Sequence, residues 1–189
     1  MATFTVDTAF DVTDPTDGST SLREALALAN ADPDPDTIGF APSLAGTTLA
    51  LVQGELVIET SLTIDGPATD RLVIDAQGQS RVMSIDDGDP GLEPRVVLRD
   101  LALRGGDDRK ADYFEREGGA GIYVANAAVR LEHVAVTNNR GDGPGPGILN
   151  QDGNVVIEQS EIAGNQSYSG GGGIFNAGYI NNCLSRTLR

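Results

Sequence analysis

The sequence predicts an all-β protein, a right-handed parallel β-helix with a short amphipathic helix that caps its N-terminal end. Two observations predict this fold class. Short apolar strands recur in groups of three, and several independent landmarks return every 26 residues. The composition agrees, because 24 glycines, 9 prolines and only 5% aromatic residues suit short strands joined by many turns.

Residues 1–47 are expected to form an N-terminal cap of one strand and one helix. Residues 3–12 alternate apolar and polar side chains, as a strand at the edge of a sheet does. Ser21 and Glu24 have the spacing of a capping box, in which the two side chains satisfy backbone N–H groups at a helix start. The helix is expected over residues 21–31, because an Asp-Pro-Asp-Pro segment follows and proline cannot continue it.

Residues 48–189 are expected to form the coils of the β-helix. A Gly-Ile pair, an apolar triplet and an asparagine each recur after 26 residues. An earlier copy of the triplet, at Val96, precedes its partner at Val129 by 33 residues, so that coil contains an insertion. The Gly-Ile pairs begin at Gly121, Gly147 and Gly173. Further strands are expected at residues 48–52, 56–58, 62–64, 72–74 and 82–85.

Stacked coils should align equivalent side chains in ladders. One inward ladder is expected at Ile122, Ile148 and Ile174, because strands that stack in parallel keep one side-chain register. Asn139 is expected to pair its side-chain amide with that of Asn165 at a turn. A second inward ladder is expected at Leu131, Ile157 and Cys183.

The C-terminal coil is expected to be uncapped or truncated. Leu188 keeps the register of Ile162, but no capping segment follows it. An open coil exposes unpaired strand edges, which invite pairing with another chain. A homo-oligomer with a contact at Leu188 is therefore expected.

The sequence resembles bacterial surface and secreted proteins with parallel β-helix repeats. The resemblance rests on the Ser-Leu-Arg-Glu-Ala segment at residues 21–25, on Gly164-Asn165, and on the Gly-Gly-Gly-Ile-Phe-Asn segment at residues 171–176. It covers nearly the whole chain, although Thr20 stands where such proteins usually have cysteine. The resemblance implies the architecture and an extracellular or cell-surface location. It implies little about activity, because such proteins include adhesins, passenger domains and carbohydrate-active enzymes.

An apolar stripe is expected on an outer face of the coils. Tyr123, Leu149 and Phe175 each follow an inward isoleucine, so alternation directs them outward and in register. A loop or a neighbouring subunit would cover them, or a ligand would bind along them; a reversed facing is the remaining alternative. An interface between copies is the favoured consequence.

Two acidic segments are candidate calcium sites. An insertion of seven residues lies between Leu103 and Ile122, and functional groups often occupy such loops. A solvated charged loop is the alternative reading of this segment. The calcium ligands would be the carboxylates of Asp86, Asp87, Asp89, Asp107, Asp108 and Asp112, with Tyr113 and Phe114 as candidate binding residues.

Asp100 and His133 are the candidate catalytic residues. His133 is the only histidine, so any mechanism that needs an imidazole base must use it. The repeat aligns Asp100, His133 and Gln159 at one turn position, which would let Asp100 orient the imidazole ring. A surface turn explains the same residues, since no serine nucleophile is marked by a motif.

Composition excludes several classes of partner. A net charge of −15 opposes binding to nucleic acid and to anionic lipid, and no apolar run is long enough for a membrane span. The single cysteine excludes an internal disulfide. Residues 1–10 lack the basic start and the apolar block of a signal peptide. The acidic surface favours solubility and the collection of divalent cations.

Two functions from different classes follow. The first is a non-catalytic surface or secreted module for adhesion or assembly, with another copy, a glycan or a cell-surface polymer as its partner and no required cofactor. The second is a hydrolase or polysaccharide lyase on the same scaffold, assisted by calcium. The regular repetition and the absence of a complete catalytic motif favour the first.

Overall fold

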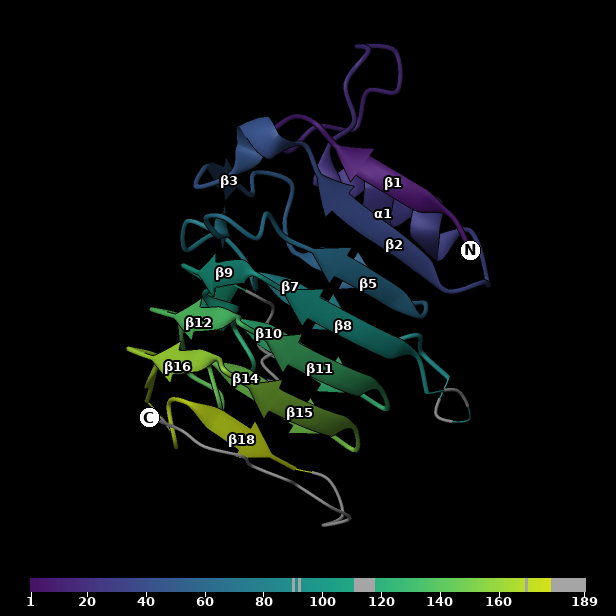
Figure 1. Ribbon diagram of the computed structural model, residues 1–189. Coiled ribbons are helices and arrows are strands. Elements are labelled where there is room, and N and C mark those ends of the chain that lie inside the picture. Colours follow the sequence, from purple (N-terminus) through teal and green to yellow (C-terminus); the bar gives the residue numbers. More distant parts are fainter. Residues whose placement is uncertain (90, 92, 111–117, 169, 178–189) are drawn as a thin grey trace.

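The computed structural model describes residues 1–89, 91, 93–110, 118–168 and 170–177. These residues are mostly β-structure, and their strands pair in parallel, as the sequence predicts. The one α-helix among them is α1 (Leu22–Asn30), and no described helix is long and apolar enough to span a membrane. Figure 1 shows the strands stacked from the N-terminal end down to β18.

Three main sheets carry the strands, and the chain visits them in a constant order before it returns one level further along the stack. The first sheet contains β1 (Thr3–Val6), β2 (Asp36–Phe40), β5 (Leu62–Asp65), β8 (Arg95–Arg99), β11 (Ala128–Glu132) and β15 (Asn154–Glu158). The second contains β3 (Thr48–Ala50), β6 (Leu72–Asp75), β9 (Leu101–Arg104), β12 (Ala135–Thr137) and β16 (Glu161–Ala163). The third contains β4 (Leu56–Ile58), β7 (Met83–Ile85), β10 (Ile122–Ala125), β14 (Ile148–Gln151) and β18 (Ile174–Asn176).

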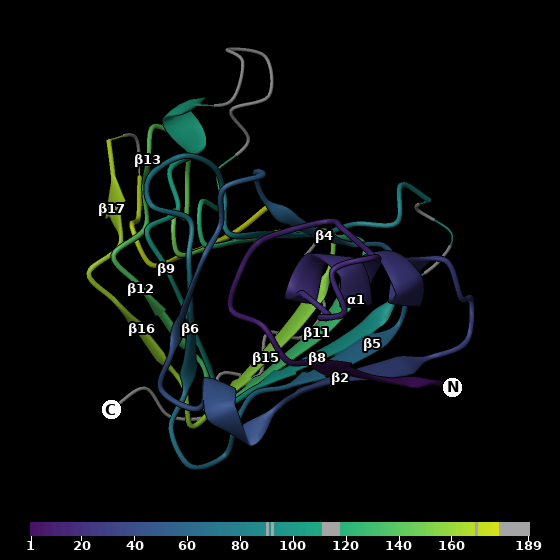
Figure 2. The ribbon, with the colours of Figure 1, turned by 90° about the horizontal axis from the view of Figure 1, so that it is seen from above.

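The three sheets face a shared interior. Figure 2 shows them from above, with α1 lying across the N-terminal end of that interior. A small corner projects between the second and third sheets. It consists of β13 (Arg140–Gly141), β17 (Gln166–Ser167) and the 3-10 helix η2 (Asp108–Lys110), while a second 3-10 helix, η1 (Pro42–Leu44), precedes β3.

The expected ladders are present in register. Ile122 pairs with Ile148, and Ile148 pairs with Ile174. Val96 pairs with Val129 across the coil that carries the insertion. Leu131 pairs with Ile157, whereas Cys183 lies outside the described residues.

The core is built from such ladders. In the first sheet, Ile38, Ile64, Leu98 and Leu131 stack in register and are fully buried. Each buried aliphatic side chain of this size contributes about 1.5–3 kcal/mol to folding through removal of its surface from water. The alternation of inward apolar and outward polar positions therefore sets the register of the whole stack.

Buried asparagines satisfy polar groups at the turns. The Asn139 side chain donates from Nδ2 to Asn165 Oδ1 at 3.0 Å, which confirms the expected amide pair. Asn139 also accepts at Oδ1 from the Gly106 N–H at 2.8 Å. Asn150 donates to Asn176 Oδ1 at 2.8 Å. These bonds link one coil to the next at the turns.

The Ser-Leu-Arg-Glu-Ala segment fastens the N-terminal cap. The capping box of Ser21 and Glu24 is present at the start of α1, and Leu22 and Ala25 are buried against the core. Arg23 donates to the Asp11 carboxylate at 2.7 and 3.1 Å and to the backbone oxygens of the Gly54-Glu55 turn. The segment therefore has an architectural role.

One expected element is shorter than its pattern suggested. The strand expected over residues 3–12 ends at Val6, and Phe10 is exposed to solvent. The reason is a pair of hydrogen bonds between Asp7 and Thr20, which turn the chain away from the sheet edge. Strand β2 is an element that the sequence pattern did not identify.

Candidate functional site

The outer face of the third sheet carries the expected apolar column. Tyr123, Leu149 and Phe175 are paired in register along β10, β14 and β18. Two members of the column are covered, because Tyr123 is 7% exposed and Leu149 is 3% exposed. Phe175 is 40% exposed.

Glycine loops cover the middle of this column. A Cβ atom placed on Gly119 would lie 2.9 Å from the Cβ atom of Leu149, and one on Gly145 would lie 2.7 Å from that of Phe175. Only glycine allows the backbone to come so close to these side chains. A loop therefore covers Tyr123 and Leu149, which is one of the alternatives that the sequence left open.

Tyr123 also has polar neighbours. The Arg81 guanidinium lies over its ring, with 4.8 Å between Cζ and the ring centroid. Its hydroxyl donates to Gln151 Oε1 at 3.3 Å. Arg81 in turn bonds Glu55 Oε2 and the Gly118 carbonyl, each at 3.1 Å. The aromatic ring is therefore fixed from several sides.

Asp107 is a buried anion held between two arginines. Its carboxylate accepts hydrogen bonds from Arg109 at 2.8 Å and from Arg140 at 3.0 Å. Burial raises the pKa of Asp107, but the bonds from these guanidinium groups outweigh that effect and lower the pKa below its usual value. Two adjacent guanidinium groups oppose a cation here, so Asp107 does not suit a calcium site.

Asp108 is buried too, but its surroundings differ. Its Oδ1 accepts the Asp142 N–H at 3.0 Å, and its Oδ2 has no hydrogen-bond partner among the described residues. Burial raises the pKa of the carboxyl group, because the nearby backbone N–H groups and Arg81 compensate only in part. A Cβ atom on Gly141 would lie 2.2 Å from Oδ1, so Asp108 packs directly on β13.

The other candidate metal ligands do not converge. Asp86, Asp87 and Asp89 each accept a hydrogen bond from the backbone N–H two residues further along, as in tight turns. Across the described parts of the chain, no group of three His, Cys, Asp or Glu side chains could hold a metal ion. Asp112, Tyr113, Phe114 and Leu188 lie outside the described residues.

Asp100 and His133 occupy equivalent turn positions in successive coils, as the repeat predicts. Their backbones share the left-handed conformation, with φ of 52° and 55°, and Gln159 follows at 49°. His133 Nδ1 lies 3.9 Å from Asp100 Oδ1, and half of the histidine side chain is exposed. The described residues provide no hydroxyl hydrogen-bonded to this ring, so the pair lacks an assembled nucleophile.

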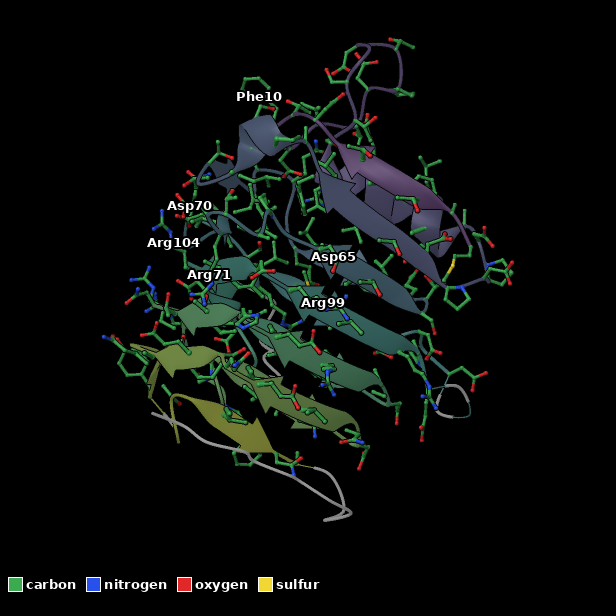
Figure 3. All side chains as sticks on the ribbon, viewed as in Figure 1. Phe10, Asp65, Asp70, Arg71, Arg99 and Arg104 are labelled. Carbon is green, nitrogen blue, oxygen red and sulfur yellow. The ribbon has the colours of Figure 1, made fainter. Side chains whose placement is uncertain are left out.

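The outer face of the first sheet carries a charged array that the sequence did not reveal. Arg99 bonds Asp65 at 2.9 Å and also bonds Glu132, while Arg130 bonds Glu132 and, at 2.6 Å, Glu158. Figure 3 shows Asp65 and Arg99 on neighbouring strands of this face. Opposite charges at paired register positions, Asp65 with Arg99 and Arg99 with Glu132, were the available signal, but the sequence contains many charged residues and none stands out.

The described residues define a mostly β protein with separate parallel sheets around a shared apolar interior and with charged side chains on the outer face of the first sheet. No family model matches the sequence, and no curated protein matches it either. The proposed function therefore rests on the arrangement of the described residues.

Proposed function

We propose that this chain is a right-handed parallel β-helix module that acts without catalysis, in assembly or adhesion, at a bacterial cell surface or outside the cell. The parallel ladders and the constant order in which the chain visits the three sheets support the architecture. The resemblance in the Ser-Leu-Arg-Glu-Ala and Gly-Ile segments supports the location.

The observation that carries the proposal is the exposed end of the third sheet. Ile174 and Phe175 are 42% and 40% exposed, whereas Ile148 and Leu149, one coil earlier, are 0% and 3% exposed. Each earlier pair is covered by the next strand, and β18 is the last strand among the described residues. Exposed apolar groups beside a strand edge favour association with another chain. A second copy of this chain is the proposed partner.

A charge placed on this end tests the proposal. Phe175→Glu should weaken self-association at least roughly tenfold, because a carboxylate would have to be buried in the contact. Val57→Glu is the matched control, since Val57 lies at the opposite end of the same register column and is 39% exposed. Sedimentation velocity over a wide range of protein concentrations measures both variants against the parent chain.

The expected result is reduced association for Phe175→Glu and unchanged association for Val57→Glu. A strictly monomeric parent chain, or equal effects of the two substitutions, would contradict self-assembly through β18.

Adhesion is tested separately by co-sedimentation with purified cell-surface polysaccharide. The charged outer face of the first sheet is the proposed polymer contact, so Arg99→Ala should reduce that binding and leave self-association unchanged.

The alternative function, a hydrolase or polysaccharide lyase, depends on the approach of His133 to Asp100. A screen of ester and glycan substrates, with and without a calcium chelator, tests it. Turnover that is lost in His133→Ala would favour catalysis over a purely structural module. Turnover that persists in this variant would remove His133 from any mechanism.

A further inference from the structure

Two arginines share one buried carboxylate at the corner where η2 lies against β13 (Figure 2). Arg109 donates from Nε and Nη2 to the two Asp107 oxygens, each at 2.8 Å. Arg140 donates from Nε to Asp107 Oδ2 at 3.0 Å. The Asp107 side chain is fully buried, whereas those of Arg109 and Arg140 are 31% and 54% exposed. The buried anion therefore holds two guanidinium groups at the surface.

The bond to Asp107 leaves one edge of the Arg140 guanidinium open. Arg140 uses only its Nε–H on Asp107, and its Nη atoms have no hydrogen-bond partner in the described parts of the chain. Together the Nη atoms present a pair of parallel N–H groups, the geometry that binds a carboxylate or a sulfate through two oxygens. Because Nε is anchored, this edge is oriented before a ligand arrives.

The balance of charge separates this corner from the outer face of the first sheet. On that face three carboxylates are bonded by Arg99 and Arg130, so negative charge is in excess. At the corner two arginines are bonded to Asp107, so positive charge is in excess around this carboxylate. Burial raises the pKa of Asp107, but the hydrogen bonds from its arginines lower it below the usual value. Asp107 therefore stays ionised, and holds both arginines, down to about pH 4.

Tyr168 and Asp142 lie near Arg109. The hydrogen bond to Asp107 raises the pKa of Arg109, and Tyr168 and Asp142 add to this effect. Tyr168 is 78% exposed, and its N–H donates to the Gly141 carbonyl at 3.2 Å, so β13 positions it. Its ring offers an apolar face beside the charged edge, which suits the C–H face of a sugar ring. Asp142 opposes an anion and should limit the affinity.

We propose that this corner binds the carboxylate or sulfate group of an acidic polysaccharide, with Arg140 and Arg109 as donors and Tyr168 against the sugar ring. The inference rests on the adhesive part of the proposed function and names the chemical class of the polymer. The net charge of −15 opposes such a polymer at long range. Salt screens that repulsion beyond about 10 Å at 0.1 M, whereas the bonds to the guanidinium groups act at contact.

Isothermal titration calorimetry with three soluble probes tests the proposal. Oligogalacturonate carries carboxylates, dextran sulfate carries sulfates, and dextran is neutral. The parent chain should bind at least one acidic probe, and should bind it roughly tenfold or more tightly than dextran. The acidic probe that binds more tightly identifies the preferred group. Absence of binding to both acidic probes, or equal affinity for dextran, overturns the proposal.

Substitutions of Arg140 locate the site. Arg140→Ala should weaken binding of the acidic probe roughly tenfold or more, because charge-assisted hydrogen bonds are lost. Asp107 keeps both bonds from Arg109 in this variant, so the corner should stay folded. Arg140→Lys keeps the positive charge but lacks the paired N–H edge, so it should weaken binding too. Arg104→Ala is the matched control, because Arg104 is 44% exposed and also donates from Nε to an aspartate, Asp75, at 2.9 Å.

The remaining outcomes separate this site from the contact proposed on the first sheet. Asp142→Asn should strengthen binding because it removes a nearby negative charge, and weaker binding would contradict an anion site. Affinities of both Arg140 variants equal to that of the parent chain overturn the proposal. Loss of binding in Arg99→Ala, with Arg140→Ala unaffected, also overturns it but leaves the polymer contact of the first sheet standing. Self-association through β18 is measured separately, by sedimentation.

Discussion

At the scale of single residues, Asp107 and Asp108 show how surroundings decide the behaviour of a carboxyl group. Both are buried and adjacent in the sequence, yet their pKa values move in opposite directions. Burial raises both, but only Asp107 has guanidinium partners close enough to reverse the effect. The two residues therefore contribute to stability with opposite dependence on pH.

Amide substitutions test this contrast. Asp107 is more acidic in the folded chain, so its contribution is present above about pH 4 and is lost as the pH falls; Asp108 is less acidic, so its ionisation lowers stability as the pH rises. Over about pH 2 to 8, Asp107→Asn should therefore become more destabilising as the pH rises towards about 4, and Asp108→Asn should become less destabilising as the pH rises above about 4. Urea unfolding across this range measures both. Parallel trends would refute the assignment of opposite shifts.

The ion pair between Arg23 and Asp11 offers a second residue-scale prediction. The Asp11 side chain is almost fully buried and also accepts the N–H groups of Val52 and Gln53. Arg23→Ala should cost about 3–5 kcal/mol of unfolding free energy, because it leaves an uncompensated buried charge. Arg130→Ala, which breaks exposed pairs, should cost less than about 1 kcal/mol. Similar losses for the two variants in urea unfolding would contradict this explanation.

At the scale of elements, recurrent glycines let the coils approach each other before the strands of the third sheet. A Cβ atom on Gly147 would lie 2.3 Å from the Gly173 carbonyl oxygen, and one on Gly121 would lie 2.5 Å from that of Gly147. At these two positions glycine is needed because a larger residue would not fit, and not because the backbone adopts a conformation that only glycine favours. In the Gly-Ile repeat, the glycine therefore allows two backbones to approach closely, and the isoleucine points inward.

Alanine substitutions separate these two roles of glycine. Gly147→Ala should destabilise the protein by more than about 2 kcal/mol, because the new methyl group meets backbone that cannot move without breaking the stack. Gly39→Ala in β2 meets nothing within 4 Å and should be neutral or stabilising by about 0.4–1 kcal/mol. Thermal unfolding of both variants measures these changes in stability. A tolerated Gly147→Ala would show that the coils can separate.

At the scale of the whole molecule, the sequence predicted the contacts that repeat from coil to coil. It did not predict the contacts that occur at one place only. The ladder of Ile122, Ile148 and Ile174 was predictable, because strand alternation and a 26-residue spacing both fix it. The contact of Arg140 with Asp107 was not, since it joins residues 33 apart and does not recur with the repeat, and a loop over Tyr123 was only one of the alternatives that the sequence left open. The surroundings of Asp107 and Tyr123 consist largely of contacts that do not follow the repeat. The sequence therefore indicated only that the candidate site lies near the insertion.

The stack should also unfold unevenly along its length, because each coil contacts only its neighbours. Central ladder residues such as Ile64 and Leu98 are fully buried, whereas Ile157 and Ile162 are only partly buried. Hydrogen exchange measured by mass spectrometry should therefore be slowest in β5 and β8 and fastest in β15, β16 and β18. Raising the protein concentration should slow exchange in β18 if copies associate there, and Phe175→Glu should remove that effect. Uniform protection along the stack would mean that the molecule opens as one cooperative unit, which a chain of neighbour contacts does not predict.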